Sequence, residues 1–124
     1  MINRKKILIV EDDPLVVKAL KEKFTKENIQ VLEATDGETG LKIALTEKPD
    51  LILLDLVLSV MDGLTMLQQL RTDSWGAKVP VIILTNLQES KEILAASEAG
   101  ANSYLVKANW RLTDIVEKIK SFLK

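Results

Sequence analysis

The chain has 124 residues, 47% of them hydrophobic and 28% charged, which excludes a disordered chain and suits a single domain, expected over residues 1–124. No apolar run approaches the roughly 18 residues of a membrane span. The formal net charge of -1 leaves no basic stripe for nucleic acid, and the absence of Cys and His excludes disulfides, imidazole bases and the usual zinc ligands. The apolar stretch 7–10 is too short for a signal peptide, so we expect a cytoplasmic protein.

Five short runs rich in Leu, Ile and Val predict strands. They are KILIV at 6–10, IQVLEA at 29–34, LILLD at 51–55, VPVIILT at 79–85 and SYLVK at 103–107. Because these runs are mostly continuous rather than alternating in polarity, they are typical of a parallel sheet that is covered on both faces.

Segments with helical periodicity lie between these runs. The first carries the apolar stripe Val16, Leu20 and Phe24, with Asp13 as the N-cap and Pro14 at the first helical position. The last carries an apolar face at helical spacing, formed by Leu112, Ile115, Val116, Ile119 and Phe122.

The middle helices are marked at their ends. Asp36-Gly37 and Asp62-Gly63 open the second and third helices, and Gly100 ends the fourth. The whole pattern is (βα)5, which predicts an α/β fold with a doubly wound, parallel, five-stranded sheet in a three-layer α/β/α sandwich.

Polar residues stand where the apolar runs stop. In a doubly wound sheet, ligands bind outside the carboxyl ends of the strands, where the strand order changes direction. The residues at these ends are Glu11, Asp12, Asp55, Thr85 and Lys107. Asp55 therefore need not be buried and unpaired within its apolar run, which would cost several kcal/mol.

Converging carboxylates repel one another, and a hard divalent cation such as Mg²⁺ keeps them ionised. The competing interpretation is that Glu11, Asp12 and Asp13 only begin a helix, because acids favour the first turn. We assign Asp13 to the cap. The expected proximity of Asp55 favours a metal site for Glu11 and Asp12.

Lys107 alone would be a routine surface lysine, and Thr85 alone a routine strand residue. Together with Asp55 and a cation they predict a phosphoryl-transfer pocket. Asp55 would be the nucleophile and form an acyl phosphate, Lys107 would neutralise phosphoryl oxygens, and Thr85 would donate a hydrogen bond to one of them.

The segments ILIVED, LILLDLVLSVMDG, VIILTN and YLVK, in this order and at these separations, resemble the receiver domain of bacterial two-component response regulators. The resemblance covers essentially the whole chain and implies the flavodoxin-like strand order 2-1-3-4-5. It implies a phosphoacceptor at Asp55 and Mg²⁺ ligation by Asp12, Asp55 and the backbone carbonyl of Val57, with Glu11 contributing through water.

The resemblance also implies a switch pair, Thr85 and Tyr104. The hydroxyl of Thr85 would move towards the phosphoryl group, and the ring of Tyr104 would change rotamer behind it. The readout surface would be the fourth helix, fifth strand and fifth helix, roughly residues 88–123.

Some positions depart from the family pattern in the loops around the pocket. Ser59 stands where proline is frequent, so we expect a looser loop. Ala108 follows Lys107 where the family has proline behind a cis peptide. A cis bond before a non-proline residue costs about 3–4 kcal/mol, so we expect either a trans bond with a slightly displaced ammonium or a strained cis bond.

Other departures affect the entrance to the pocket. Asn86 is larger than the very small residue that the family prefers, which narrows the entrance. Val57 and Leu87 are apolar at the variable flanking positions and cannot orient an attacking water. We therefore predict a comparatively long-lived phosphoryl group.

The main hypothesis is a stand-alone receiver that accepts phosphate from a histidine kinase or a histidine phosphotransfer protein, and that acts by binding a downstream protein target. We expect no direct nucleic-acid or membrane partner, and either a monomer or a phosphorylation-linked dimer. An alternative is a binding module of the same fold that no longer uses phosphate, as Asn86 and Ala108 suggest. A Mg²⁺-dependent phosphohydrolase is disfavoured, because its second acid would fall at Val57; we expect no turnover beyond the chain's own phosphorylation and dephosphorylation.

Two tryptophans offer further surface for partners. For Trp75, packing over a loop is the favoured interpretation, whereas for Trp110, just after Lys107, packing and partner binding are equally supported.

Overall fold

Apolar runs and helical segments alternate along the chain, and each strand leads into a helix. The computed structural model describes residues 4–86 and 91–123. The strands are β1 (Lys6–Val10), β2 (Gln30–Ala34), β3 (Leu51–Leu54), β4 (Val81–Thr85) and β5 (Ser103–Val106). The helices are α1 (Pro14–Lys26), α2 (Gly37–Glu47), α3 (Gly63–Arg71), α4 (Lys91–Glu98) and α5 (Leu112–Phe122), with a short 3-10 helix, η1 (Lys107–Asn109), before α5.

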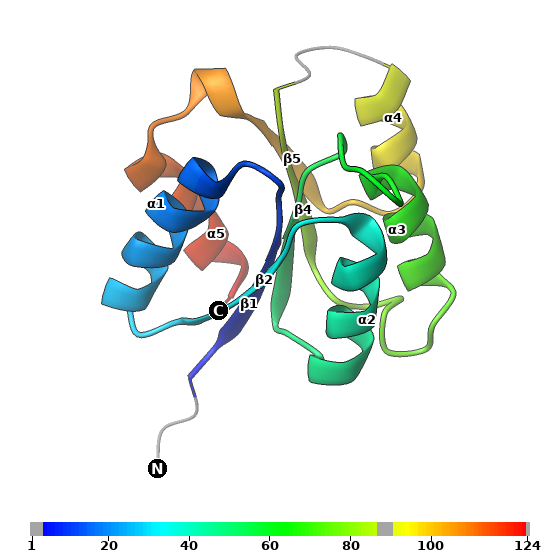
Figure 1. Cartoon of the computed structure of the whole chain (residues 1–124), viewed down its shortest axis with the longest axis horizontal. Coiled ribbons are helices and arrows are strands. Elements are labelled where there is room, and N and C mark those ends of the chain that lie inside the picture. Colours follow the sequence, from blue (N-terminus) through cyan, green and yellow to red (C-terminus); the bar gives the residue numbers. More distant parts are fainter. Residues whose placement is uncertain (1–3, 87–90, 124) are drawn as a thin grey trace.

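The strands form one parallel sheet with the spatial order β2-β1-β3-β4-β5. Helices α1 and α5 cover one face, and α2, α3 and α4 cover the other (Figure 1). The prediction of a doubly wound (βα)5 sandwich with strand order 2-1-3-4-5 is therefore confirmed.

The core consists of two apolar layers, one on each face of the sheet. The layer under α1 and α5 includes Leu20 and Phe24, both without exposed surface. The opposite layer includes Met66 and Leu67 from α3, which are equally buried. Side chains of β1, β3 and β4 contribute to both layers, which explains why their sequences are continuously apolar.

Small differences from the sequence prediction lie at the ends of the elements. β2 begins at Gln30 rather than at residue 29, and β4 begins at Val81 rather than at residue 79. In α1 the buried valine is Val17, while Val16 is half-buried at the edge of the same layer. A three-residue stripe cannot show which of two adjacent valines turns inward, because neighbours on a helix are only about 100° apart.

The predicted helix ends are confirmed. Asp13, Asp36 and Asp62 are N-caps whose side chains accept hydrogen bonds from first-turn backbone N–H groups at 3.0, 2.8 and 2.8 Å. Gly100 follows α4 with a φ of 107°, a conformation that favours glycine. In the described ranges, we find no helix with the length and hydrophobicity needed to cross a bilayer.

Candidate functional site

The site lies at the carboxyl edge of the sheet, where the order of strands reverses. β1 has β2 on one side and β3 on the other, so the connections that follow β1 and β3 leave the sheet on opposite faces. Val10 of β1 pairs with Leu54 of β3, which places the next residues, Glu11 and Asp55, at the same height. Thr85 pairs with Val106 at the ends of β4 and β5, so Lys107 follows directly at this edge.

Three carboxylates gather at this edge. Glu11, Asp12 and Asp55 each offer an oxygen, and these oxygens lie within 4.8 Å of one another. Glu11 and Asp55 are buried, with 3% and 6% of their surface exposed, whereas Asp12 is exposed. This is a donor set of hard oxygen atoms, which fits Mg²⁺ in both charge and ligand type.

Lys107 supplies the positive charge within the carboxylate cluster. Its Nζ forms ion pairs with Oε1 of Glu11 and with Oδ2 of Asp55, the latter at 3.2 Å. Only 15% of its side chain is exposed. Among the described residues no peptide bond is cis, so the bond to Ala108 is trans, one of the two expected arrangements, and the ammonium still reaches the carboxylates.

The pKa values of the buried pair reflect this arrangement. Burial raises the pKa of the Glu11 carboxyl, and the hydrogen bond from Lys107 only partly opposes this shift. Burial lowers the pKa of the Lys107 amine, but the hydrogen bond with Glu11 and the charge of Asp55 outweigh it, so the net direction is upward. Lys107 is therefore a firmly charged ammonium at neutral pH.

Asp13 also supports the site through its backbone. Its side chain caps α1 as predicted, but its backbone N–H in addition donates a hydrogen bond to Oε2 of Glu11 at 3.0 Å. One carboxylate oxygen of Glu11 is thus held by Asp13 and the other by Lys107. The contact between the backbone of Asp13 and Glu11 could not be predicted from the sequence, because a backbone N–H donor leaves no pattern in the side chains.

The loop between β3 and α3 forms the rim next to Asp55. The backbone N–H of Val57 donates to Oδ1 of Asp55 at 3.3 Å, while the side chain of Val57 is 61% exposed. The loop closes where Gly63 donates to the carbonyl of Leu56 at 3.0 Å. A Cβ atom at Gly63 would lie 2.2 Å from the carbonyl oxygen of Asp55, so only glycine allows this approach.

Neither of the expected switch residues, Thr85 and Tyr104, lines the acidic pocket. The pocket has a volume of about 320 Å³ and is lined by Glu11, Asp12, Asp13, Asp55, Val57, Asn86 and Lys107. Thr85 is fully buried at the end of β4, one residue before Asn86. Tyr104 is 51% exposed and borders a different, apolar cavity next to α4. Leu87 and the beginning of the expected readout surface, residues 88–90, lie outside the described residues.

The surroundings of the two tryptophans differ. Trp75 is half-buried and packs against the core layer of α3, which confirms the packing interpretation. Trp110 keeps 39% of its surface exposed next to η1.

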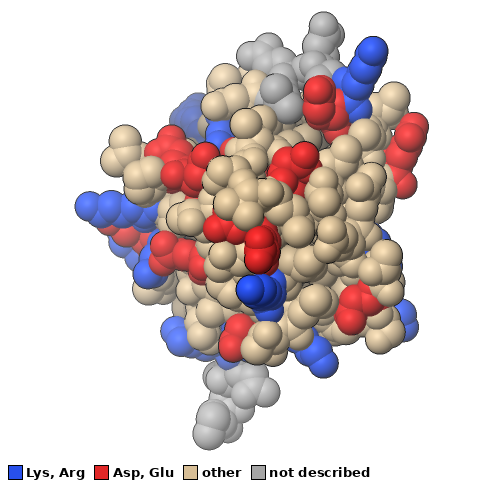
Figure 2. Space-filling view, turned by 45° about the vertical axis from the view of Figure 1, so that its right-hand side comes forward, with Lys and Arg blue, Asp and Glu red and all other residues tan. Residues whose placement is uncertain are grey.

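Acidic and basic side chains are interspersed on the face shown in Figure 2, which carries no broad basic patch among the described residues.

The model of the response regulator receiver domain family matches residues 7–120. The alkaline phosphatase synthesis transcriptional regulatory protein PhoP of Bacillus subtilis is 35% identical over 120 residues, which cover 97% of this chain and 49% of PhoP. The chain thus spans about half the length of the curated relatives it matches.

Two solved structures show the same fold. The BeF3-activated N-terminal receiver domain of Klebsiella pneumoniae RstA has a TM-score of 0.87 at 29% identity, covering 97% of this chain and 99% of that one. The receiver domain of the sensor histidine kinase PA1611 of Pseudomonas aeruginosa, which has a magnesium ion coordinated in its active-site cleft, has a TM-score of 0.88 at 26% identity, with 98% of each chain covered.

Proposed function

Because this chain belongs to the response regulator receiver domain family, we propose that it is a phosphoacceptor module in which Asp55 takes a phosphoryl group from a phosphohistidine. The donor would be a histidine kinase or a histidine phosphotransfer protein. The observation that carries the proposal is the meeting of Asp55 with an ammonium and two further carboxylates at the switch point of the sheet.

The acids at this edge would hold the metal. Glu11, Asp12 and Asp55 supply side-chain oxygens, and we propose that the backbone carbonyl of Val57 completes the protein's share of ligands, with Glu11 acting through water. When bound, Mg²⁺ would offset the charge of the carboxylates and of the phosphoryl oxygens. The structural relative with magnesium in its cleft supports this assignment.

Asp55 is the proposed nucleophile. A carboxylate oxygen of Asp55 attacks phosphorus, a P–O bond forms while the P–N bond to the donor imidazole breaks, and the imidazole nitrogen keeps the electron pair. Both Asp55 oxygens have hydrogen-bond donors in the structure, Oδ1 from the N–H of Val57 and Oδ2 from Lys107. These contacts hold the carboxylate in one orientation, so little rotational freedom has to be lost before transfer.

Lys107 and Thr85 would stabilise the product. The Lys107 ammonium already lies 3.2 Å from Oδ2 of Asp55, so it is placed to pair with an oxygen of the incoming phosphoryl group. The hydroxyl of Thr85 would reorient towards another oxygen, and the ring of Tyr104 would turn inward from its exposed position. We propose that α4, β5 and α5 then present a changed face to a downstream protein.

The pocket's lining bears on the lifetime of the phosphoryl group. The exposed Val57 lines the pocket and has no group that can position a water. We therefore predict a slow loss of phosphate. Three other expectations also stay predictions: a cytoplasmic location, the lack of a separate substrate, and a monomeric or phosphorylation-linked dimeric state.

The test is intact-mass spectrometry after incubation with acetyl phosphate and Mg²⁺. We expect a gain of one phosphoryl group that requires the metal and disappears in Asp55→Asn. The matched control is Asp114→Asn, an exposed acid in the first turn of α5, which should be phosphorylated like the wild type. A folded wild-type protein that gains no mass would instead favour the phosphate-independent binding module. Asn86 and Ala108 would then be the first positions to replace, by a very small residue and by proline as in the family pattern.

A further inference from the structure

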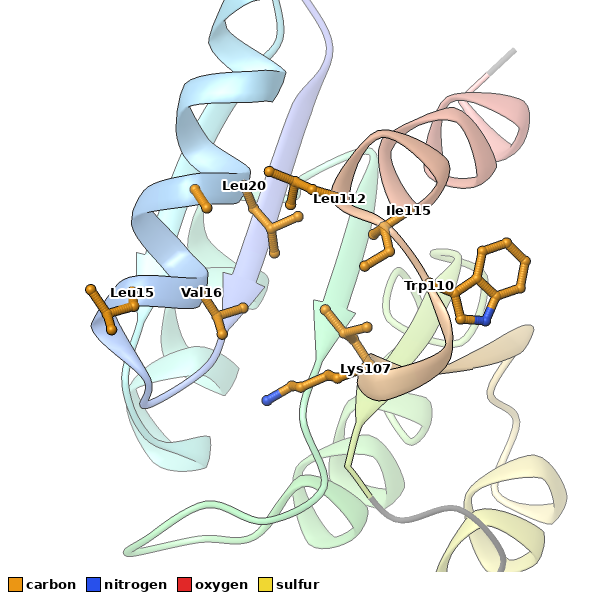
Figure 3. Close-up of a pocket in the computed structure, with 9 residues that line it drawn as sticks. Leu15, Val16, Leu20, Lys107, Trp110, Leu112 and Ile115 are labelled. Atoms are coloured by element: carbon orange, nitrogen blue, oxygen red, sulfur yellow. The ribbon is translucent and has the colours of Figure 1, made fainter.

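An apolar groove lies between α1 and α5 (Figure 3). It has a volume of about 310 Å³. Residues from both helices and from the connection before α5 line it, among them Leu15, Ala19, Lys107, Trp110, Leu112 and Ile115. Leu15 is 76% exposed, so the groove is open to solvent along α1.

Lys107 lines both the groove and the acidic pocket. In Figure 3 its side chain extends from η1 towards the part of α1 that carries Leu15 and Val16. Its Nζ is ion-paired with Glu11 and Asp55, while its hydrocarbon stem borders the groove. Because only 15% of this side chain is exposed, the stem cannot shift without changing the space beside it.

The segment that carries Lys107 is held weakly at its own ends. Within the described residues, η1 has no side-chain hydrogen bond at its N-cap, Val106, and α5 has none at its N-cap, Arg111. A helix end without such a cap lacks the stabilisation that a capping side chain gives, so this connection resists displacement less than the capped starts of α1, α2 and α3.

We propose that Lys107 couples occupancy of Asp55 to the shape of this groove, by a route that does not pass through Thr85 and Tyr104. The inference rests on the proposed function, because it requires a phosphoryl group or its analogue on Asp55. Such a group carries about -1.5 to -2 charges and replaces the single charge of the carboxylate, so the negative charge beside Nζ increases by up to about one and is spread over new oxygens. The ammonium then leaves Glu11 for the new anionic oxygens, the stem withdraws from the groove, and water takes its place.

The chain contains no cysteine, so single labels can be placed cleanly. The probe is a bimane fluorophore on Ala19→Cys, which lines the groove, with Val16→Cys as a second position should the first variant fail to fold. The matched control is Lys18→Cys, which is exposed and does not line the groove. Beryllofluoride with Mg²⁺ stands in for the phosphoryl group, and ¹⁹F NMR shows directly whether it is bound.

With beryllofluoride bound, we expect the emission of the groove label to shift to longer wavelength and the emission of the Lys18→Cys label to stay unchanged. The shift should persist in Tyr104→Ala and Thr85→Ala backgrounds whenever ¹⁹F NMR shows a bound analogue. A groove label that does not respond to bound beryllofluoride, or that responds only with Thr85 and Tyr104 intact, would overturn the inference. Failure of beryllofluoride to bind would overturn the proposed function itself, and this inference with it.

Discussion

Glu11 is the residue at which burial and charge oppose each other most directly. The residue is 3% exposed, and burial raises the pKa of its carboxyl above the ordinary value of 4.5 despite the nearby ammonium of Lys107. Between the pKa of the unfolded chain and the higher pKa of the folded state, the folded protein binds more protons. Without a divalent cation, stability should therefore fall as pH rises from about 4.5 through the folded-state pKa.

Glu11→Gln tests this expectation, because it removes the titrating group at nearly constant volume. We expect the free energy of unfolding of the wild type to fall relative to Glu11→Gln as pH rises across that window. Urea unfolding at a series of pH values in a chelating buffer measures the difference. Glu22→Gln, an exposed change in α1, is the control and should follow the wild type. Parallel curves for Glu11→Gln and the wild type would show that the buried carboxyl titrates normally.

At the scale of elements, the loop between β3 and α3 contains a valine in an unfavourable backbone conformation. Val60 has a φ of 66° and its side chain is 77% exposed. A left-handed conformation costs an L-residue about 1–2 kcal/mol, and β-branched side chains tolerate it worst. The loop is held on both sides of Val60, by a γ-turn-like bond from Met61 to Ser59 at 2.7 Å and by a bond from Gly37 to Met61 at 3.0 Å.

Val60→Asn should therefore raise the free energy of unfolding by about 1 kcal/mol, because asparagine tolerates left-handed φ values. The reverse substitution can be tested at Asn28, which is exposed and has a φ of 62°. Asn28→Val should lower the free energy of unfolding by a similar amount. Chemical denaturation measures both changes, and a stabilised Asn28→Val or a destabilised Val60→Asn would refute the explanation by strain.

The elements themselves follow closely from the sequence, but their long-range side-chain contacts do not. The continuous apolar run of β3 and the caps at Asp36 and Asp62 depend on neighbours in the sequence, and the structure contains them as predicted. Arg71 gave no such signal. Its guanidinium donates at 2.7 Å to the carbonyls of Gly76, Val79 and Gly100, joining α3 to the connection that follows it and to the distant connection before β5. Only the folded chain brings those carbonyls together.

In the candidate site, too, some features could be predicted from the sequence and others depend on the folded chain. The strand-end rule correctly predicted that Glu11, Asp12, Asp55 and Lys107 would meet, because register in a parallel sheet aligns the strand ends. The rule also placed Thr85 in this cluster, whereas Thr85 is fully buried and is not among the residues that line the pocket, because a strand-end residue can turn towards the lining or towards the core.

At the scale of the whole molecule, the acidic cluster connects ion binding to stability. The acids come from the ends of β1 and β3, which are central strands, so an ion that binds only the folded arrangement stabilises the entire chain. Mg²⁺ at ten times its Kd should add about 1.4 kcal/mol, which corresponds to a rise in Tm of about 5 °C for a domain of this size.

Asp12→Asn should abolish most of this rise, because Asp12 is an exposed member of the cluster and its loss costs little packing. Differential scanning calorimetry with and without Mg²⁺ measures the effect, and Asp114→Asn should respond to the ion like the wild type. An equal rise in Tm in Asp12→Asn would show that Mg²⁺ stabilises the protein from another site.

The central claim is that the carboxylate of Asp55 carries the phosphoryl group as an acyl phosphate. Borohydride reduces an acyl phosphate on aspartate to homoserine, and this leaves a permanent mark at the modified position. After treatment with acetyl phosphate and Mg²⁺, followed by borohydride and peptide mass spectrometry, we expect homoserine at position 55 and at no other acid, and none when the phosphodonor is omitted. Homoserine at another aspartate, or an unreduced phosphate on a hydroxyl side chain, would contradict the account.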